Sequence, residues 1–373
     1  MGGNIFGKLF KITSFGESHG EVVGIIIDGV PSGIHIDMEF IQSELNKRKP
    51  GQSKVVTDRN ESDKAKILSG VFKKKTTGAP ICIIIENKDI DSSKYEKYKD
   101  FLRPSHIDYS ALKRYGGYAD YRGSGRFSGR ITAGVVMAGA LAKQILKLYN
   151  ISVFAYTLSI GEIEDNEDYF INNLEDFIEK RERSIVRSLN PKKSEKMIDL
   201  IENIKNENDS IGGIIRCVVN NFPSGGGSPV FEGLESNISK AIFSIPAIKG
   251  IEFGAGFKAA KMKGSQHNDP WIIKNDDIRT TKNDAGGIIG GISTGMSIEF
   301  QIAVKPTASI SIEQNTVDIV RMENTKLKLT GRHDPCIVPR AVIVIEAMTA
   351  IALLDQLLFE GKIPLVNDTE GKK

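Results

Sequence analysis

Apolar positions along the chain follow two different spacings. Short apolar runs bounded by Gly, Pro or Asp are typical of β-strands, whereas longer segments with apolar residues three or four positions apart predict α-helices. The expected strands cover roughly residues 22–27, 81–86, 151–160, 213–220, 251–258 and 296–304. The expected helices cover roughly residues 37–48, 108–115, 131–148, 173–183, 193–206, 234–243 and 341–358.

Two of the expected helices are rich in small residues. TAGVVMAGALAKQILKLY (132–149) contains two glycines, and AVIVIEAMTAIALLDQLL (341–358) contains four alanines. A helix that is apolar on most faces and carries many small side chains is predicted to be buried and tightly packed. Each follows a segment with glycine and arginine, GRFSGR (125–130) or GRHDPCIVPR (331–340), which indicates a duplicated unit of arginine-bearing loop and central helix.

Residues 161–210 differ in composition from the rest of the chain. They contain GEIEDNEDYFINNLEDFIEKRERS and then a segment rich in Lys and Glu, which is typical of a solvated, mostly helical excursion on the surface. Apolar strands are expected on both sides, so we place no domain boundary there. Residues 1–373 are therefore expected to form a single domain, with a loose C-terminal tail from about residue 362.

Glycine content and its clustering change this picture by pointing to ligand-binding loops. The chain has 37 glycines in 373 residues, against about 7% in an average protein. They cluster at 116–134, 224–233, 250–256 and 286–295, interleaved with arginine, aromatic or β-branched residues. Such clusters predict loops where the backbone closely approaches a ligand or another backbone.

Charge and cysteine content argue against several classes of protein. The chain has 50 basic and 47 acidic residues, and its net charge of +3 gives no argument for nucleic acid or membrane binding. Three cysteines without paired spacing, Cys82, Cys217 and Cys336, indicate a reducing compartment and no structural zinc. The N-terminus lacks a secretory pattern, and the longest apolar stretches carry charges such as Lys143 and Glu346. We therefore expect a soluble cytoplasmic protein.

The segment TSFGESHGEVVG (13–24) contains the first candidate catalytic residue. Its His19 lies in a turn between glycines, where it has the freedom to reach a ligand. Histidine has an unperturbed pKa of about 6.5 and can act as an acid or a base near neutral pH. The alternative is a hydrogen-bonded loop histidine with no role in catalysis.

A basic, glycine-rich segment is the second candidate site. LRPSHIDYSALKRYGGYADYRGSGRFSGR (102–130) contains five arginines and His106, with only Asp108 and Asp120 against them. Phosphate and carboxylate groups require planar bidentate donors and unhindered N–H groups, and the loop leads into a helix whose N-terminus favours an anion. Small-anion binding is the preferred interpretation, and a solvated basic loop or an RNA contact is the alternative.

Three further segments carry candidate chemistry. LNKRKPGQSK (45–54) places basic residues around a Pro-Gly turn, which is most often solvated. AGGIIGGISTGMSIEFQIAVKPTASI (285–310) predicts either a flat surface for an aromatic ring with a phosphate tail or a glycine-rich β-turn. In GRHDPC (331–336), Arg332 lies near Asp334, and an adjacent arginine favours an ionised carboxylate that can act as a base. A salt-bridged structural turn is the alternative there.

Several common site motifs do not occur. GSGRFSG departs from a dinucleotide fingerprint because its third glycine comes one position late and no clear strand precedes it, which argues against a nicotinamide-dependent dehydrogenase. The sequence contains no Walker phosphate loop, no HxxxH or CxxC metal-binding spacing and no GxSxG nucleophile elbow.

Three long motifs together resemble the chorismate synthase family. They are GESHG (16–20), YRGSGRFSGRITAG (121–134) and GRHDPC (331–336), and the resemblance extends from about residue 4 to residue 361. Shorter stretches that agree with the family are DGVPSGI (28–34), RKPGQS (48–53), ILSGVF (67–72), RPSHIDY (103–109), DSIGG (209–213), KGIEFGAGF (249–257), KGSQ (263–266) and AGGIIGGISTG (285–295).

The resemblance implies a lyase of the shikimate pathway. Its reaction is the anti-1,4-elimination of phosphate and a C6 proton from 5-enolpyruvylshikimate 3-phosphate, which gives chorismate for aromatic amino acid biosynthesis. Reduced FMN is required without net redox change. Either the chain reduces its own FMN with NADPH or a separate flavin reductase does so; the sequence has no long insertion that suggests a fused reductase, so we expect NADPH to act indirectly through a separate one. The implied fold is an α+β sandwich, with helices between antiparallel sheets, that assembles as a homotetramer.

The resemblance also implies roles for individual residues. His19 is expected to be an acid near the departing phosphate, His106 to lie at the flavin, and Asp334 to act with the flavin in taking the C6 proton. The flavin site corresponds to Arg126, Phe127, Ser128, Pro246, Ala247, Gly290, Lys305, Pro306, Thr307, Ala308, Ser309 and Arg332. Substrate or NADP anions are expected to meet Arg48, Lys54, Arg130 and Arg332.

Two positions depart from the family pattern. Phe127 stands where many members have Ser, which could alter packing against the flavin. Lys54 stands where many have Arg, which replaces a bidentate donor with a point charge. Neither removes a proton-transfer group, so we expect activity. The alternative function is an anion- or RNA-binding protein that uses the basic loop alone.

Overall fold

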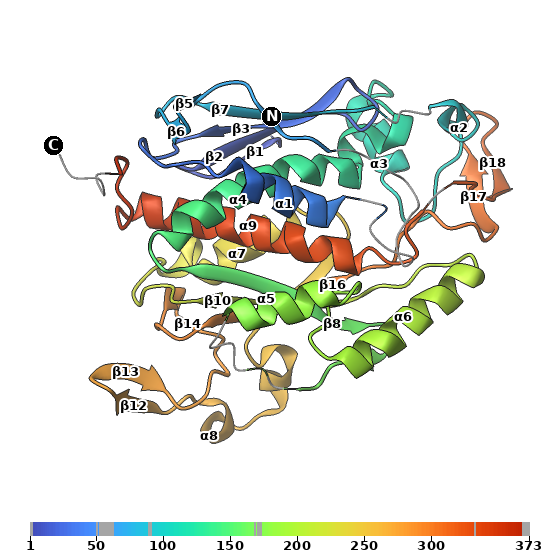
Figure 1. Ribbon diagram of the computed structural model, residues 1–373. Helices are drawn as coiled ribbons and strands as arrows, with labels where there is room; N and C mark the ends of the chain where they lie inside the picture. Colours follow the sequence, from blue (N-terminus) through green and yellow to red (C-terminus); the bar gives the residue numbers. More distant parts are fainter. Residues whose placement is uncertain are drawn as a thin grey trace.

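Two antiparallel sheets enclose a layer of helices. The computed structural model describes residues 3–49, 51, 63–88, 92–167, 169, 174–331 and 333–367. Within this part of the chain, Figure 1 shows one sheet above the helices and the other below them. The arrangement confirms the expected α+β sandwich.

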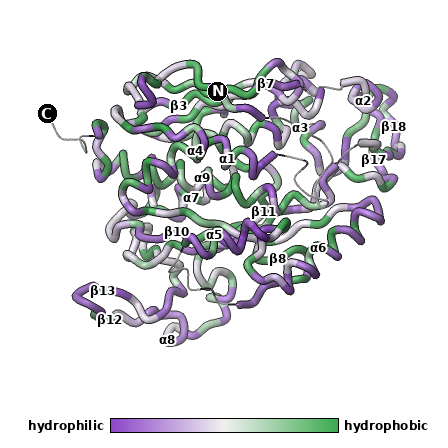
Figure 2. Tube along the Cα trace, viewed as in Figure 1, coloured by the Kyte–Doolittle hydropathy of each residue, from purple (hydrophilic) through white to green (hydrophobic). Residues whose placement is uncertain are grey.

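The first sheet has the strand order β1-β2-β3-β7-β4, and all its pairings are antiparallel. Its strands are β1 (Ile5–Phe6), β2 (Lys11–Gly16), β3 (Val22–Asp28), β7 (Ile81–Glu86) and β4 (Lys66–Ile67). In β7, Ile81, Ile83 and Ile85 are buried, as expected when alternate side chains face the core. Figure 2 shows the hydrophobic character of β3 and β7.

The second sheet has the strand order β11-β16-β10-β8-β9, again antiparallel. Its strands are β11 (Ile248–Phe253), β16 (Ile298–Val304), β10 (Gly213–Asn220), β8 (Ser152–Ile160) and β9 (Ile163–Glu164). Ile298, Phe300 and Ile302 of β16 belong to the same buried cluster as the isoleucines of β7. One hydrophobic core therefore extends from the first sheet through the helices to the second.

The helix layer consists of α1 (Met38–Arg48), α4 (Thr132–Lys147), α7 (Leu234–Phe243) and α9 (Val338–Phe359). The prediction that both small-residue helices are buried is confirmed for α4 and α9. By length and composition α9 could cross a membrane, but 89% of its most apolar window is buried inside the structure. Its apolar character is explained by its place between the sheets.

Gly139 allows α4 and α9 to approach each other closely. A Cβ atom at this position would overlap the backbone and side chain of Ala347 in α9. Overpacking of this kind costs about 1–3 kcal/mol, which outweighs the gain of about 1 kcal/mol from replacing glycine in a helix. We expect Gly139→Ala to lower the melting temperature by a few degrees, measured by differential scanning fluorimetry. Gly264→Ala is the control, because no atom lies within 4 Å of its added Cβ, and an equal effect of both substitutions would contradict the packing argument.

The remaining elements lie around the sandwich. The helices are α2 (Ser93–Glu96), α3 (Asp108–Tyr115), α5 (Leu174–Arg183), α6 (Pro191–Asn206) and α8 (Gly264–His267), with 3-10 turns η1 (Arg122–Phe127), η2 (Gly129–Ile131), η3 (Val230–Glu232) and η4 (Gly256–Lys261). The hairpins pair β5 (Val71–Phe72) with β6 (Lys75–Thr76), β12 (Trp271–Lys274) with β13 (Asp277–Thr280), β14 (Ile288–Ile289) with β15 (Ile292–Ser293), and β17 (Gln314–Asp318) with β18 (Glu323–Leu327).

Residues 161–210 contain α5 and α6, and their inward faces are buried. Phe177 of α5 belongs to a small second cluster with Phe154 and Tyr156 of β8, whereas Met197 and Ile201 of α6 belong to the main core. Arg181, on the same helix as Phe177, is 2% exposed. The prediction of a solvated surface excursion, which was based on charge composition, therefore applies only to the outer faces of these helices.

The structure differs from the expected elements at the end of one strand and in strands that the sequence did not predict. β11 ends at Phe253 rather than near residue 258, because Gly254 and Gly256 adopt φ of +53° and +52° and turn the chain into η4. The sequence did not predict β2, nor the exposed hairpin β12–β13, which projects at the bottom of Figure 1. After α9, Asn367 donates a backbone hydrogen bond to Ser32, which lies after β3 and forms an isolated bridge with Val366.

Candidate active site

A cavity of about 550 Å³ lies where the N-terminal ends of α4 and α9 meet the C-terminal end of α1. Most of the residues singled out in the sequence line it, although they come from distant segments. They are Arg48, His106, Phe127, Ser128, Arg130, Pro246, Ala247, Lys305, Pro306, Thr307, Ala308 and Asp334. Cavities of a few hundred to a thousand Å³ are typical of small-molecule and cofactor sites.

Residues 123–125, in η1, form a loop that contacts both candidate histidines. Gly123, Ser124 and Gly125 all adopt positive φ, at 56°, 68° and 49°. A Cβ at Gly123 would overlap the ring of His19, so glycine is required for the close approach. On its other side, the Ser124 hydroxyl lies 3.3 Å from His106 Nε2. The glycines in this motif therefore bring the loop against both imidazoles.

His106 is held by a carboxylate two residues away. Its Nδ1 lies 2.9 Å from Asp108 Oδ1, and the same carboxylate accepts hydrogen bonds from the backbone N–H and Nε of Arg103, both at 2.9 Å. Although burial alone would raise it, the hydrogen bonds from His106 and Arg103 hold the pKa of Asp108 well below its usual range. An ionised Asp108 fixes Nδ1 as the donor, so Nε2 is the atom that faces the loop.

His19 lies in a second, adjoining cavity of about 250 Å³, which Ser309 also lines. The two cavities share Ile107 and Phe127 in their walls. His19 is 5% exposed, its Nδ1 lies 2.9 Å from the Ser92 hydroxyl, and its ring meets Tyr95 edge-on. His19 therefore lines a different, adjoining cavity from Arg48 and Arg130.

One buried carboxylate, Asp63, joins two of the candidate anion-binding arginines. Asp63 Oδ1 forms an ion pair with Arg130 Nη1, and Oδ2 lies 3.4 Å from Arg48 Nη1. All three side chains are 5% exposed or less. Arg48 also donates to the Gly129 carbonyl at 2.8 Å, and Arg130 to Asn87 Oδ1 at 3.0 Å. Sequence reasoning missed Asp63, because its partners are far away in the chain.

Asp334 is paired with an arginine that sequence reasoning also missed. Arg340, in the first turn of α9, forms an ion pair with Asp334 through Nη1 and donates from Nε to the Arg48 carbonyl at 3.0 Å. The position of Asp334 is thereby linked to the end of α1. The expected partner Arg332 and the expected anion-binding residue Lys54 lie outside the described residues.

Two expected flavin residues do not line either cavity. Arg126 donates to the backbone carbonyls of Gly16 at 2.9 Å and Ser14 at 3.0 Å, so it braces β2, and its partial burial lowers the pKa of its guanidinium. Gly290 lies in the turn between β14 and β15. Both were assigned by resemblance alone.

The larger cavity is suited to an anionic ligand with a flat ring. Lys305 donates to the Ser105 carbonyl at 2.8 Å, and burial together with the charge of Lys249 lowers its pKa. The hydroxyl of Thr307 is buried in the cavity wall and has no hydrogen-bond partner among the described residues; such orphaned groups are costly unless a ligand satisfies them. Pro246, Ala247 and Phe127 provide apolar surface. These residues fit FMN; among the described residues no group of His, Cys, Asp or Glu is arranged to hold a metal ion.

Comparisons with known proteins agree on one family. The family model described as "Chorismate synthase" matches residues 10–358. A chorismate synthase from Dehalococcoides mccartyi is 51% identical over 97% of this chain and 99% of its own length. One from Korarchaeum cryptofilum is 49% identical over 96% of this chain and 98% of its own length. A solved structure titled "Crystal Structure of Chorismate Synthase" superposes with a TM-score of 0.75 at 30% identity, covering 95% of this chain and 93% of that one.

Proposed function

The chain belongs to the chorismate synthase family of lyases, and on that premise we propose that it eliminates phosphate and the C6 proton from 5-enolpyruvylshikimate 3-phosphate to give chorismate, with reduced FMN as cofactor. In this reaction the C3–O bond to phosphate and the C6–H bond break, and no net oxidation occurs. The observation that carries the proposal is the convergence of paired arginines, His106 and Asp334 on one cavity.

Arg48 and Arg130 are the proposed anion-binding residues. Their guanidinium groups are already held by Asp63, so little side-chain entropy is lost when an anion binds. Bidentate donors match the geometry of phosphate and carboxylate. Preorganised cations also stabilise the negative charge that develops on the departing phosphate.

The flavin is proposed to be held by Phe127, Ser128, Pro246, Ala247 and the segment 305–309. The Thr307 hydroxyl would gain the hydrogen-bond partner that it lacks. When bound, reduced FMN supplies electron density that makes loss of phosphate possible and recovers it afterwards. The chain itself supplies orientation, exclusion of water and charge.

Proton transfer is assigned to three side chains. Asp334 is proposed to accept the C6 proton, with Arg340 holding its carboxylate in place. His106 is proposed to exchange a proton at Nε2, the ring nitrogen that faces the loop because Asp108 holds Nδ1 as the donor. His19 is proposed to protonate the phosphate as it leaves, and a positioned acid of this kind contributes roughly 10²–10⁴ in rate.

The arginine pairings argue against the alternative of an RNA-binding protein. Arg103 is paired with Asp108 at 2.6 Å and Arg122 with Asp120 at 2.9 Å. Arg126 is engaged with the backbone of β2. The basic loop is therefore largely neutralised within the fold rather than displayed as a cationic surface.

An anaerobic assay tests the proposed function. We expect the purified chain to convert 5-enolpyruvylshikimate 3-phosphate to chorismate with equimolar phosphate release when FMN is reduced by dithionite. An aerobic assay with NADPH and FMN alone is expected to give no product, because we propose that a separate reductase supplies the reduced flavin. Absence of chorismate in the anaerobic assay would contradict the proposal.

We also propose a cytoplasmic homotetramer. The support is the family membership together with the free cysteines, which are typical of a reducing compartment. Light scattering coupled to size-exclusion chromatography measures the assembly directly. A monomer of 40.9 kDa at working concentration would contradict the tetramer.

A further inference from the structure

The C-terminal end of α1 is held by two arginines from other parts of the chain. Helix α1 ends at Arg48, and the last carbonyls of any helix lack partners within the helix. Arg187 Nη2 donates to the Lys47 carbonyl at 3.1 Å, and Arg340 Nε donates to the Arg48 carbonyl at 3.0 Å. Cations at this end also complement the helix dipole. The residue that carries a cavity arginine is thus fixed through its backbone.

Arg187 itself is locked in place, although it lies outside both cavities. Its backbone carbonyl accepts a hydrogen bond from Thr157 of β8 at 2.9 Å, and its N–H donates to Ser184 at 2.9 Å. It adopts φ of +58°, which is unusual for a residue other than glycine. Its side chain is 9% exposed and pairs with Glu182 at 2.6 Å.

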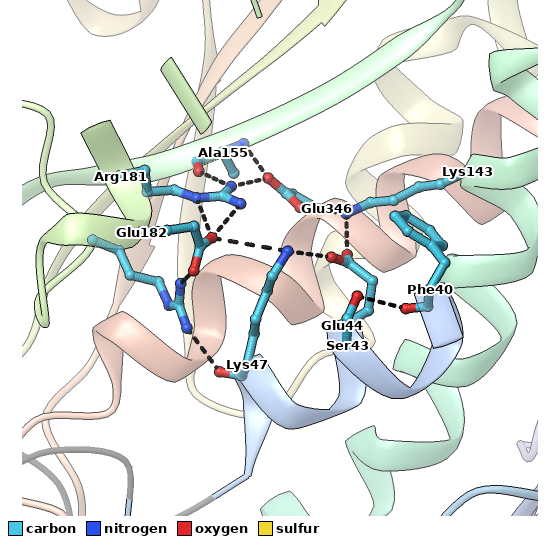
Figure 3. Close-up of polar contacts among 10 residues, drawn as sticks. Phe40, Ser43, Glu44, Lys47, Lys143, Ala155, Arg181, Glu182 and Glu346 are labelled. Carbon is cyan, nitrogen blue, oxygen red and sulfur yellow. Dashed lines mark hydrogen bonds and ion pairs between the residues drawn. The ribbon is translucent and has the colours of Figure 1, made fainter. Parts of the chain in front are cut away.

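Glu182, whose side chain is 30% exposed, connects Arg187 to a closed ring of charges whose other members are half-buried or buried. Glu182 pairs with Arg181, which pairs with Glu346 of α9; Glu346 pairs with Lys143 of α4. Lys143 pairs with Glu44 of α1 at 2.6 Å, and Glu44 pairs with Lys47 of the same helix at 2.6 Å. A contact of 3.9 Å between Lys47 and Glu182 closes the ring. Figure 3 shows Glu44, Lys47, Lys143, Arg181, Glu182 and Glu346 pointing toward one another from four helices.

Two buried members of the ring, Glu44 and Lys143, have pKa values shifted toward their charged forms. Although burial would raise it, Lys143 and Lys47 lower the pKa of Glu44 to about 2. Although burial would lower it, Glu346 and Glu44 raise the pKa of Lys143. Glu346 also accepts a hydrogen bond from the Ala155 backbone at 2.7 Å, and Arg181 donates to the Ala155 carbonyl at 2.8 Å. The ring therefore ties the helices to the edge of β8 with directional contacts, which apolar packing would not provide.

We propose that Arg187 is a positioning residue for Arg48, and that the ring of charges, acting through Glu182 and Arg187, sets the affinity of the anion site without touching the ligand. Loss of the Arg187 side chain removes the donor from the Lys47 carbonyl and releases the turn that carries Arg48. The Asp334 side of the cavity remains held by Arg340. The effect is therefore expected on anion binding, and much less on the proton-transfer step.

The test compares Arg187→Ala with Arg183→Ala, whose side chain is 75% exposed and pairs only with Glu179 among the described residues. We expect Arg187→Ala to raise the KM for the phosphorylated substrate about tenfold, as for loss of one charged hydrogen bond. The kcat of Arg187→Ala and its affinity for FMN should stay close to wild type. Arg183→Ala should leave KM, kcat and FMN affinity unchanged. Arg187→Lys keeps the positive charge but loses the planar set of guanidinium N–H donors, so it should give an intermediate KM.

This inference rests on the proposed function only for the choice of substrate. A second measurement, which does not need that substrate, tests the inference separately. Calorimetric titration with inorganic phosphate should show about tenfold weaker binding for Arg187→Ala than for wild type, whether or not the wild type makes chorismate. Unchanged KM and unchanged phosphate affinity in folded Arg187→Ala would overturn the role of Arg187. So would a joint loss of kcat, substrate affinity and FMN affinity, which indicates general disorder. If Arg187→Ala does not fold, Arg187→Lys and Glu182→Gln decide by the same measurements.

Discussion

Replacing His106 with alanine is expected to slow chorismate formation several hundredfold while the protein stays folded. The imidazole is fixed between Asp108 and the Ser124 hydroxyl, at 2.9 Å and 3.3 Å, so its removal deletes a positioned proton-transfer group worth roughly 10²–10⁴ in rate. The substitution leaves intact the ion pairs that Asp63 forms with Arg48 and Arg130. The anaerobic assay with reduced FMN measures the rate, and circular dichroism checks the fold.

Two further substitutions show whether the loss of activity in His106→Ala is specific to the active site. His35→Ala is the matched control, since His35 is exposed on the surface away from both cavities, and its rate should equal wild type. His19→Ala is expected to be impaired to a similar degree as His106→Ala, because the departing phosphate then lacks its acid. Near-normal rates in both His19→Ala and His106→Ala would refute the roles assigned to them.

The sequence pattern predicted the parts of the fold that depend on local periodicity. Helices α4 and α9 were expected from their small apolar residues, and β7 from an isoleucine run bounded by turn signals. β2 and the hairpin β17–β18 were not expected, because KITSFG and ENTKL carry too few apolar residues to stand out from a loop. Their pairing partners elsewhere in the fold decide their conformation.

The candidate site was predictable to the extent that its residues lie in distinctive motifs. Gly123 and Gly125 indicate a loop with positive φ angles, and this loop contacts both His19 and His106. Asp63 could not be found in this way, because its partners Arg48 and Arg130 are 15 and 67 residues away. Arg340 was part of a quoted motif, but nothing in the motif shows that its guanidinium joins Asp334 to the end of α1. Long-range ion pairs of this kind leave no periodic signal.

Asp334→Asn is expected to lower kcat several hundredfold, with KM for the substrate and affinity for FMN nearly unchanged. The amide keeps the shape of the side chain and can still accept a hydrogen bond from Arg340, but it cannot take a proton from C6. An interaction needed only in the transition state appears in kcat rather than in KM. Steady-state kinetics with reduced FMN and a flavin titration measure the three constants.

Two comparisons distinguish a proton acceptor from a merely structural carboxylate. A substrate deuterated at C6 should show a larger isotope effect with Asp334→Asn than with wild type, because proton removal then limits the rate more fully. Asp277→Asn is the matched control: Asp277 also pairs with an arginine, at 2.8 Å, but on the exposed hairpin β12–β13, where such pairs contribute little. A raised KM with an unchanged isotope effect would instead mean that Asp334 acts through Arg340 on the end of α1. Retention of kcat within about threefold, roughly 0.6 kcal/mol in the barrier, would remove Asp334 from the proton path altogether.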